Sequence, residues 1–178
     1  RKILQLRLRN ILNDMNIFYL SRCPHKSAKL MCDKHIVKMI LESAQMLCTA
    51  HHVNGTLLLK SDIYKPAYKN HPSTVWVRES ALHYNWLYMH FLTLCDEYTR
   101  RYGKVHLTYT KLAFYLASLP KQFPKDNFRS PPKCMPDIYK KGHTVFAYRK
   151  YYANAKKHFA KYTNTPVPNF LRSNFYHV

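Results

Sequence analysis

The spacing of polar and apolar residues between Ser27 and His52 predicts one long amphipathic helix. Its polar residues recur every three or four positions, which places them on one face: His35, Lys38, Glu42, Gln45, Thr49 and His52. The apolar residues fall on the other face, which we expect to point into the core: Leu30, Val37, Ile40, Leu41, Ala44, Leu47 and Cys48. Such a polar stripe is typical of side chains mounted for an active site, and also of a solvated helix face.

Three further blocks of the chain show helical periodicity. They run from Ser73 to about Tyr102, from Leu107 to Leu119 and from about Thr144 to Tyr162. Ser73 is a residue type that caps helix starts, and Gly103 suits the left-handed position that follows a helix end. The run Asn16–Leu20 is the one strand candidate.

These elements predict a mainly α fold. We expect a single-domain bundle of about four helices with at most a short N-terminal strand. Residues 1–14 are basic and apolar without the continuous core of a signal peptide, so we interpret them as an N-terminal extension ahead of a helical nucleic-acid-binding domain over residues 15–178. No apolar run is long enough for a membrane span, so no membrane partner is expected.

Charge points to the partner. Lys and Arg total 29 against 9 Asp and Glu, a formal net charge of +20, which is typical of proteins that bind a polyanion. The alternative is a basic protein kept soluble by its charge. Five cysteines, an odd number, favour a reducing compartment over a disulfide framework.

Cations interleave with aromatic residues in two segments, the connector around residues 64–71 and the last predicted helix. Cations neutralise phosphates and aromatic rings stack on exposed bases. The candidate nucleic-acid-binding residues are Lys65, Lys69, Arg149, Lys150, Tyr151, Lys156, Lys157 and Lys161. The alternative is that the aromatic residues pack the core and the lysines are solvated.

A second polar stripe lies on the Ser73–Tyr102 block: Glu79, His83, Trp86, His90 and Glu97. It either meets the first stripe in a polar cleft or forms ion pairs on the surface. The cleft hypothesis gives six candidate catalytic residues: His35, Lys38, Glu42, His71, Arg78 and Glu79. Three Cys/His pairs have ligand-like spacing, but there is no C-x-x-C pair, so neither a metal nor another cofactor is expected.

Several motifs resemble a family of small bacteriophage proteins, especially from marine phages, that are commonly labelled pyrimidine dimer DNA glycosylases. They are Met15–Leu20, Cys32–Leu47, Asn70-His71-Pro72, Trp76, Arg78-Glu79-Ser80, Cys95–Gly103 and Thr165–Pro168, and the resemblance covers about Met15 to Phe170. It implies DNA repair by base excision and strand cleavage at ultraviolet photoproducts, in the cytoplasm of an infected bacterial host.

Such chemistry needs an amine that attacks the sugar C1′ to form a Schiff base, and a carboxylate that handles protons. Lys38 and Glu42, one helical turn apart, are the candidates, although Glu42 is also placed to be only an ion-pair partner. The best-known phage enzyme of this kind uses its N-terminal amine, whereas this chain has residues ahead of Met15. Two alternatives stay open: a non-catalytic nucleic-acid-binding protein of a virion or ribonucleoprotein, and another nucleotide-modifying enzyme that uses the same cleft.

Overall fold

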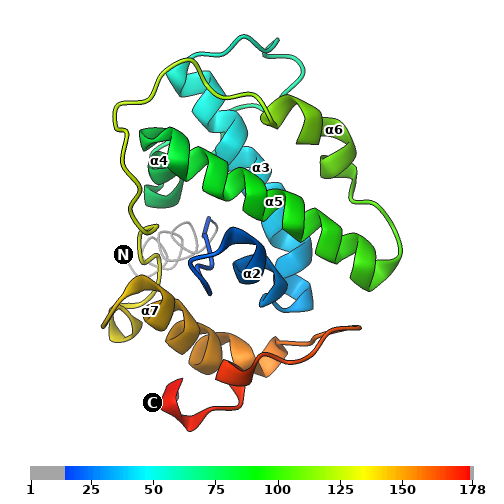
Figure 1. Ribbon diagram of the computed structural model, residues 1–178, viewed down its shortest axis with the longest axis vertical. Helices are drawn as coiled ribbons and strands as arrows, with labels where there is room; N and C mark the ends of the chain where they lie inside the picture. Colours follow the sequence, from blue (N-terminus) through cyan, green and yellow to red (C-terminus); the bar gives the residue numbers. More distant parts are fainter. Residues whose placement is uncertain (1–14, 177–178) are drawn as a thin grey trace, which may run out of the picture.

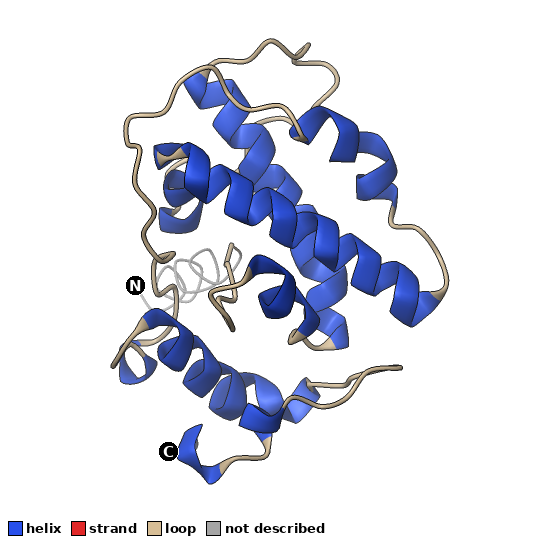
Figure 2. Ribbon diagram, viewed as in Figure 1, coloured by secondary structure: helices blue, strands red, loops and turns tan. Residues whose placement is uncertain are grey.

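Six α-helices, joined by loops and short helical turns, form the described part of the chain, which is residues 15–176 of a computed structural model. In chain order they are α2 (Pro24–Lys29), α3 (Asp33–Asn54), α4 (Pro72–Glu79), α5 (Ala81–Tyr102), α6 (Leu107–Leu116) and α7 (Thr144–Tyr151). These residues contain no strand, and their one β-type pairing is an isolated bridge between Ser80 and Lys125 (Figure 2). The predicted mainly α fold is confirmed. The extension predicted over residues 1–14 lies outside the described residues.

The two long helices, α3 and α5, cross at the centre of the molecule (Figure 1). Helix α2 packs against α5, while α4 and α6 contact both long helices. Helix α5 buries a run of apolar side chains, with Tyr84, Leu87, Phe91 and Leu94 fully inaccessible. None of the described helices is both long and apolar enough to cross a membrane.

The first predicted helix is two helices, because the chain leaves helical geometry between α2 and α3. Cys32 is extended (φ −70°, ψ 162°), and its amide donates to the Tyr152 hydroxyl at 2.9 Å. The amide of Asp33 donates to the Lys161 carbonyl, also at 2.9 Å. Amides at a helix start have no partner within the helix. The C-terminal segment therefore fixes where α3 begins, by contacts that local sequence does not encode.

The second predicted helix is also broken, at Ser80. Its backbone is extended (φ −147°, ψ 143°), and its Oγ accepts from the Leu82 amide at 3.2 Å and so caps α5. The Glu79 carbonyl, which ends α4, accepts from the Lys125 amide at 2.9 Å. The break thus exchanges intrahelical bonds for a side-chain cap and a bond to a distant loop.

Helix ends agree with the sequence pattern in part. Gly103 follows α5 in the left-handed conformation (φ 68°, ψ 18°), as predicted. Ser73 is not the N-cap of its helix, since His71 takes that place and its Nδ1 accepts from the Ser73 amide at 3.2 Å. The last helix begins at Thr144 as predicted and continues past α7 through a π-turn, η2 (Tyr152–Lys156), and a 3-10 turn, η3 (Lys157–Phe159). It ends before the predicted Tyr162.

The strand candidate Asn16–Leu20 is extended and buried but forms no strand within the described residues. The Ser27 hydroxyl occupies the place of a partner strand: it accepts from the Leu20 amide at 3.0 Å and donates to the Phe18 carbonyl at 2.9 Å. Ser27, at which the predicted helix begins, lies inside α2 instead. The Ser27 side chain thus forms the hydrogen bonds to the Phe18 carbonyl and the Leu20 amide that a partner strand would otherwise form.

The expectation that the apolar face of α3 points inward is wrong at several positions. Val37 and Leu41 are 42% and 43% exposed, whereas His35, Glu42 and Thr49 are buried. Helix α3 is surrounded by α4, α5, α6 and the C-terminal segment, so several of its polar side chains are buried. Spacing alone identifies the two faces but not which of them a neighbouring element covers.

Candidate active site

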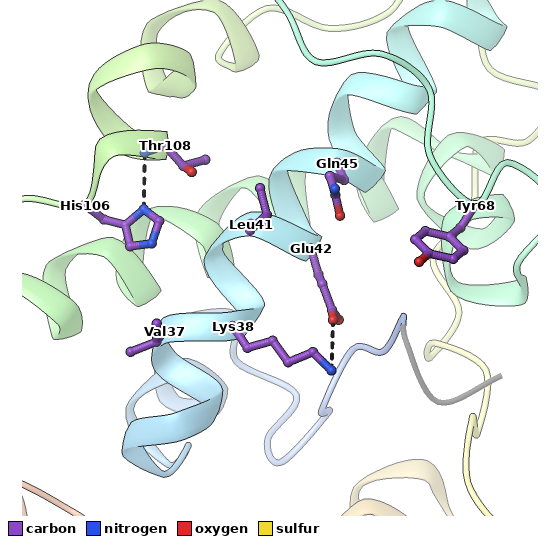
Figure 3. Close-up of a pocket in the computed structure, with 8 residues that line it drawn as sticks. All are labelled: Val37, Lys38, Leu41, Glu42, Gln45, Tyr68, His106 and Thr108. Atoms are coloured by element: carbon purple, nitrogen blue, oxygen red, sulfur yellow. Dashed lines mark hydrogen bonds and ion pairs between the residues drawn. The ribbon is translucent and has the colours of Figure 1, made fainter. Parts of the chain in front are cut away.

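A surface pocket of about 480 Å³ opens along α3, between the start of α6 and the connector from α3 to α4. Eight residues line it: Val37, Lys38, Leu41, Glu42, Gln45, Tyr68, His106 and Thr108. Figure 3 shows the α3 side chains in the middle, with His106 and Thr108 on one side and Tyr68 on the other. The pocket therefore combines the exposed apolar residues of α3 with the central part of its polar stripe.

An ion pair between Lys38 and Glu42 lies in this pocket, with 3.3 Å between Lys38 Nζ and Glu42 Oε1. The Glu42 side chain is only 7% exposed, and that of Lys38 is 48% exposed. A buried carboxylate needs a charged or hydrogen-bonding partner, which Lys38 supplies. The pair holds an amine that a ligand can reach beside a sheltered carboxylate, a combination suited to attack by the amine with local proton transfer.

Two other residues of the polar stripe hold the connector against α3. The Thr49 hydroxyl accepts from the Ala67 amide at 3.0 Å, and His52 Nε2 donates to the Tyr64 carbonyl at 3.0 Å. The Tyr64 hydroxyl in turn lies 3.3 Å from that of Thr108 at the start of α6. Both sides of the pocket are thus attached to the helix that carries the ion pair.

Tyr68 stands at the pocket edge with an unusual backbone. Its φ is +47°, a left-handed conformation that costs a non-glycine residue about 1 kcal/mol or more. The bonds of the preceding Ala67 to Thr49 hold it on one side, and on the other its carbonyl accepts from the His71 amide at 2.9 Å. The ring is 45% exposed and lies on the side of α3 that carries Glu42 (Figure 3). It offers an aromatic face on which a base can stack.

His106 caps α6 from within the pocket. Its Nδ1 accepts from the Thr108 amide at 3.2 Å, so the neutral ring carries its proton on Nε2. Burial lowers the pKa of this imidazole. His106 is therefore a neutral hydrogen-bond donor in the pocket wall.

His35 does not line the pocket. Its ring stacks on Phe18 with 4.2 Å between centroids, and its Nδ1 lies 2.8 Å from the Tyr152 hydroxyl. Burial, followed by the charges of nearby lysines, lowers its pKa to about 3. It is neutral near pH 7 and joins α3 to the N- and C-terminal segments.

The remaining candidate catalytic residues also lie outside the pocket wall. His71 caps α4, and Arg78 Nη1 donates to a backbone carbonyl of the connector at 2.6 Å. Glu79 pairs with Lys125, at 3.1 Å, and with Arg129. Of the six candidates, the structure brings Lys38 and Glu42 together in the pocket, and the other four hold structural elements in place.

The polar stripe of the second block faces elements other than α3. His83 Nε2 accepts from the Arg129 amide at 3.0 Å, and His90 Nδ1 donates to the Pro24 carbonyl at 3.0 Å. Glu97 pairs with Arg101 at 3.1 Å. These side chains fasten α2, the 120–130 loop and the end of α5. The pocket is therefore not the predicted polar cleft between the two helical stripes, because no residue of the second stripe lines it.

Comparison with known families adds an independent observation. The family model of pyrimidine dimer DNA glycosylases matches residues 15–110, which is more than half of the chain. The chain belongs to the pyrimidine dimer DNA glycosylase family. No curated protein and no solved structure matches it.

The whole pocket lies within the part of the chain that matches the glycosylase family, since its lining residues run from Val37 to Thr108. Helix α7 and the C-terminal turns lie outside the match. The predicted nucleic-acid-binding residues lie both inside and outside the residues that match the family. Lys65 and Lys69 lie inside the matched region, and the other six lie outside it.

Within the glycosylase region, Lys65 and Lys69 are exposed and stand on either side of Tyr68 in sequence. In the C-terminal segment, Lys157 and Lys161 are exposed, and Lys150 and Lys156 are partly exposed. Arg149 has a structural role instead, because its Nε donates to the Leu20 carbonyl at 2.9 Å and its guanidinium stands over the Phe170 ring at 5.4 Å. Tyr151 is buried beneath Lys156, with 4.9 Å between ammonium and ring centroid.

The five cysteines of this glycosylase family member are free thiols. Burial raises the pKa of Cys48 and Cys95 to about 12, which keeps them protonated and unreactive near neutral pH. Among the described residues, no group of three or more His, Cys, Asp and Glu side chains is arranged to hold a metal ion.

Sequence reasoning missed three of the pocket residues, Tyr68, His106 and Thr108. Tyr68 lies in the basic and aromatic connector, which was the available signal, but nothing marked it above its neighbours. His106 is an uncommon type of N-cap, and neither it nor Thr108 belongs to a recognisable motif. Their role depends on how α6 packs against α3.

Proposed function

We propose that this protein is a DNA glycosylase with AP-lyase activity that acts on pyrimidine photoproducts. In this proposal Lys38 is the amine nucleophile and Glu42 handles protons. The supporting observation is the 3.3 Å pair between them, held in a pocket that lies wholly within the glycosylase family region. The free thiols suit a reducing compartment, and the resemblance to phage proteins makes the cytoplasm of an infected bacterium our proposed location.

The reaction begins when the Lys38 amine, relieved of a proton by Glu42, attacks C1′ of the damaged nucleotide. A bond forms between nitrogen and C1′ as the glycosidic bond breaks, and the base leaves with its bonding electron pair and takes up a proton. The nitrogen then loses its second proton, and the sugar ring opens as the C1′–O4′ bond breaks and O4′ takes up the proton that Glu42 holds, which leaves an iminium ion between Lys38 and C1′. The iminium ion acidifies C2′, so that removal of a C2′ proton by Glu42 expels the 3′ phosphate by β-elimination. Water then hydrolyses the imine and restores the lysine.

The proposed substrate agrees with the surroundings of the pocket. Tyr68 offers a ring on which a base can stack, and His106 offers a neutral hydrogen-bond donor. The exposed Lys65 and Lys69 lie in the connector, and the net charge of +20 favours a polyanion. We treat residues 15–178 as one nucleic-acid-binding domain, because the bonds of Cys32 and Asp33 tie the C-terminal segment to the start of α3.

Borohydride trapping on ultraviolet-irradiated duplex DNA tests the proposal. The wild-type protein should nick the duplex and form a covalent adduct, and peptide mapping should place the adduct on Lys38. Lys38→Ala should lose the adduct. Glu42→Gln should bind the duplex with little change yet lose turnover by about 100-fold or more, the size of effect expected for a general base. Lys60→Ala, at an exposed residue outside the pocket wall, is the matched control.

A wild-type protein that binds irradiated DNA without adduct or nick would overturn the lyase proposal and support the non-catalytic binding protein. An adduct that persists in Lys38→Ala would assign the nucleophile to another amine.

A further inference from the structure

Two lysine ammonium groups converge on one aromatic ring near the start of α3. Lys34 Nζ is 4.9 Å from the centroid of Phe159, and Lys156 Nζ is 5.9 Å from it. Lys156 also lies 4.9 Å over Tyr151. Lys38, the amine of the pocket, follows Lys34 by one turn of α3 and so lies about 6 Å further along the helix. The three lysines come from two segments, α3 and η2, that are far apart in sequence.

The buried ring of His35 lies against the same Phe159 ring. It contacts Phe159 edge to face with 5.5 Å between centroids. Its pKa is lowered to about 3, first by burial and then by the charges of Lys156, Lys38 and Lys34. The imidazole is neutral and so leaves the charges of these ammonium groups uncompensated.

No carboxylate compensates the outer two lysines. Among residues 15–176, neither Lys34 nor Lys156 forms an ion pair. The neighbouring Asp33 is engaged by Arg101 at 3.0 Å and by the Thr163 hydroxyl at 2.6 Å. A cation over a ring keeps its full charge. Like charges gathered by a fold repel one another, so the cluster is poised to take an anion.

We propose that Lys34 and Lys156 bind a backbone phosphodiester of the DNA strand whose nucleotide enters the pocket and reaches Lys38. The inference rests on the proposed function, because the nucleotide in the pocket is what brings a phosphate to this place. Lysine ammonium groups bind phosphate as point charges, and the partly exposed ring of Phe159 presents an apolar surface to the sugar. The lysine cluster thus sets the path of the strand across the start of α3.

The salt dependence of binding to an undamaged duplex tests this without any chemistry. Each phosphate contact on B-DNA contributes about 0.9 to the slope of log K against log salt concentration. Lys34→Ala/Lys156→Ala should therefore reduce the steepness of the slope by about 0.9, because the two lysines neutralise the same phosphodiester. The control, Lys60→Ala/Lys121→Ala, removes the same charge from exposed residues near the opposite end of α3, where the Lys121 amide bonds to the Gly55 carbonyl. It should leave the slope unchanged.

Equal losses in both double variants would mean that net charge alone matters and would overturn the phosphate site, as would an unchanged slope in Lys34→Ala/Lys156→Ala. Thermal unfolding should show both variants folded. A free phosphate ion as the true ligand would appear as an unchanged slope together with a loss of inorganic phosphate binding in Lys34→Ala/Lys156→Ala, and would also overturn it. Because the slope needs no adduct or nick, failure of the lyase proposal and failure of this site remain distinguishable.

Discussion

Acid should unfold this protein well before its carboxylates are protonated, because three histidines are buried in the neutral form. Burial is the main cause of the lowered pKa in each: about 3 for His35, about 4 for His51 and about 4 for His90. In the unfolded chain an imidazole has a pKa near 6.5. Between these values the unfolded state binds more protons than the folded state, so stability is complete above about pH 6.5 and is lost as pH falls below it.

The magnitude follows from linkage. Each such histidine costs up to about 1.4 kcal/mol per pH unit below its unfolded pKa, which is about 2 kcal/mol between pH 7 and pH 5. The three together cost about 6 kcal/mol, comparable with the total stability of many domains. Burial also lowers the pKa of His83 and His106, which adds to the loss. Carboxylates of the unfolded chain titrate near pH 4, outside this window.

Urea unfolding at pH 7, 6 and 5, followed by circular dichroism, measures the free energy of unfolding at each pH. His90→Asn is destabilised at every pH, but its slope against pH should fall by about 1.4 kcal/mol per unit because one linked group is gone. A wild-type free energy that is flat to within about 1 kcal/mol from pH 7 to pH 5 would refute the reasoning. So would an unchanged slope in His90→Asn.

Two further predictions concern particular side chains. Tyr68→Ala should weaken binding of irradiated duplex by about 1–3 kcal/mol in a fluorescence anisotropy titration, whereas Tyr68→Phe keeps the ring and should bind as the wild type does. Tyr68→Gly should bind as weakly as Tyr68→Ala. Its folded state should nevertheless be more stable than that of Tyr68→Ala, because the φ of +47° at this position suits glycine. Arg101→Leu should lower the free energy of unfolding by about 3–5 kcal/mol, because Asp33 and Glu97 lose a fully buried partner, whereas the half-exposed Arg100→Ala should cost at most about 1 kcal/mol. Equal losses in the two arginine variants would contradict that reasoning.

Local sequence predicted the helical class and several helix ends because these depend on short-range physics. Gly103 accepts a left-handed backbone without strain, and α3 ends at Asn54, two residues beyond the predicted end at His52. The two breaks were not predictable in this way. One depends on Tyr152 and Lys161 at the start of α3, more than 100 residues away in sequence.

The candidate site was predictable only where a single helix contains it. Lys38 and Glu42 are one turn apart on α3, so helical spacing alone places them together. Tyr68 and His106 reach the same pocket through the connector and α6, and no periodicity encodes that convergence. Conversely, His83 and His90 have the spacing of a shared helical face, but they bond to other elements: His90 to α2 and His83 to the 120–130 loop.

The polar stripe of α3 divides along its length into three roles. At its start, His35 bonds to the C-terminal segment; at its end, Thr49 and His52 hold the connector. The Lys38–Glu42 pair therefore lies between two segments that are bonded to α3. One is the C-terminal segment, which carries Lys156 of the lysine cluster, and the other is the connector, which carries Tyr68. Loss of an outer stripe residue should therefore alter the position of bound DNA more than the chemistry of the pair. Thr49→Val would release the Ala67 amide and with it the ring of Tyr68, so binding should weaken while the adduct on Lys38 still forms at saturating DNA.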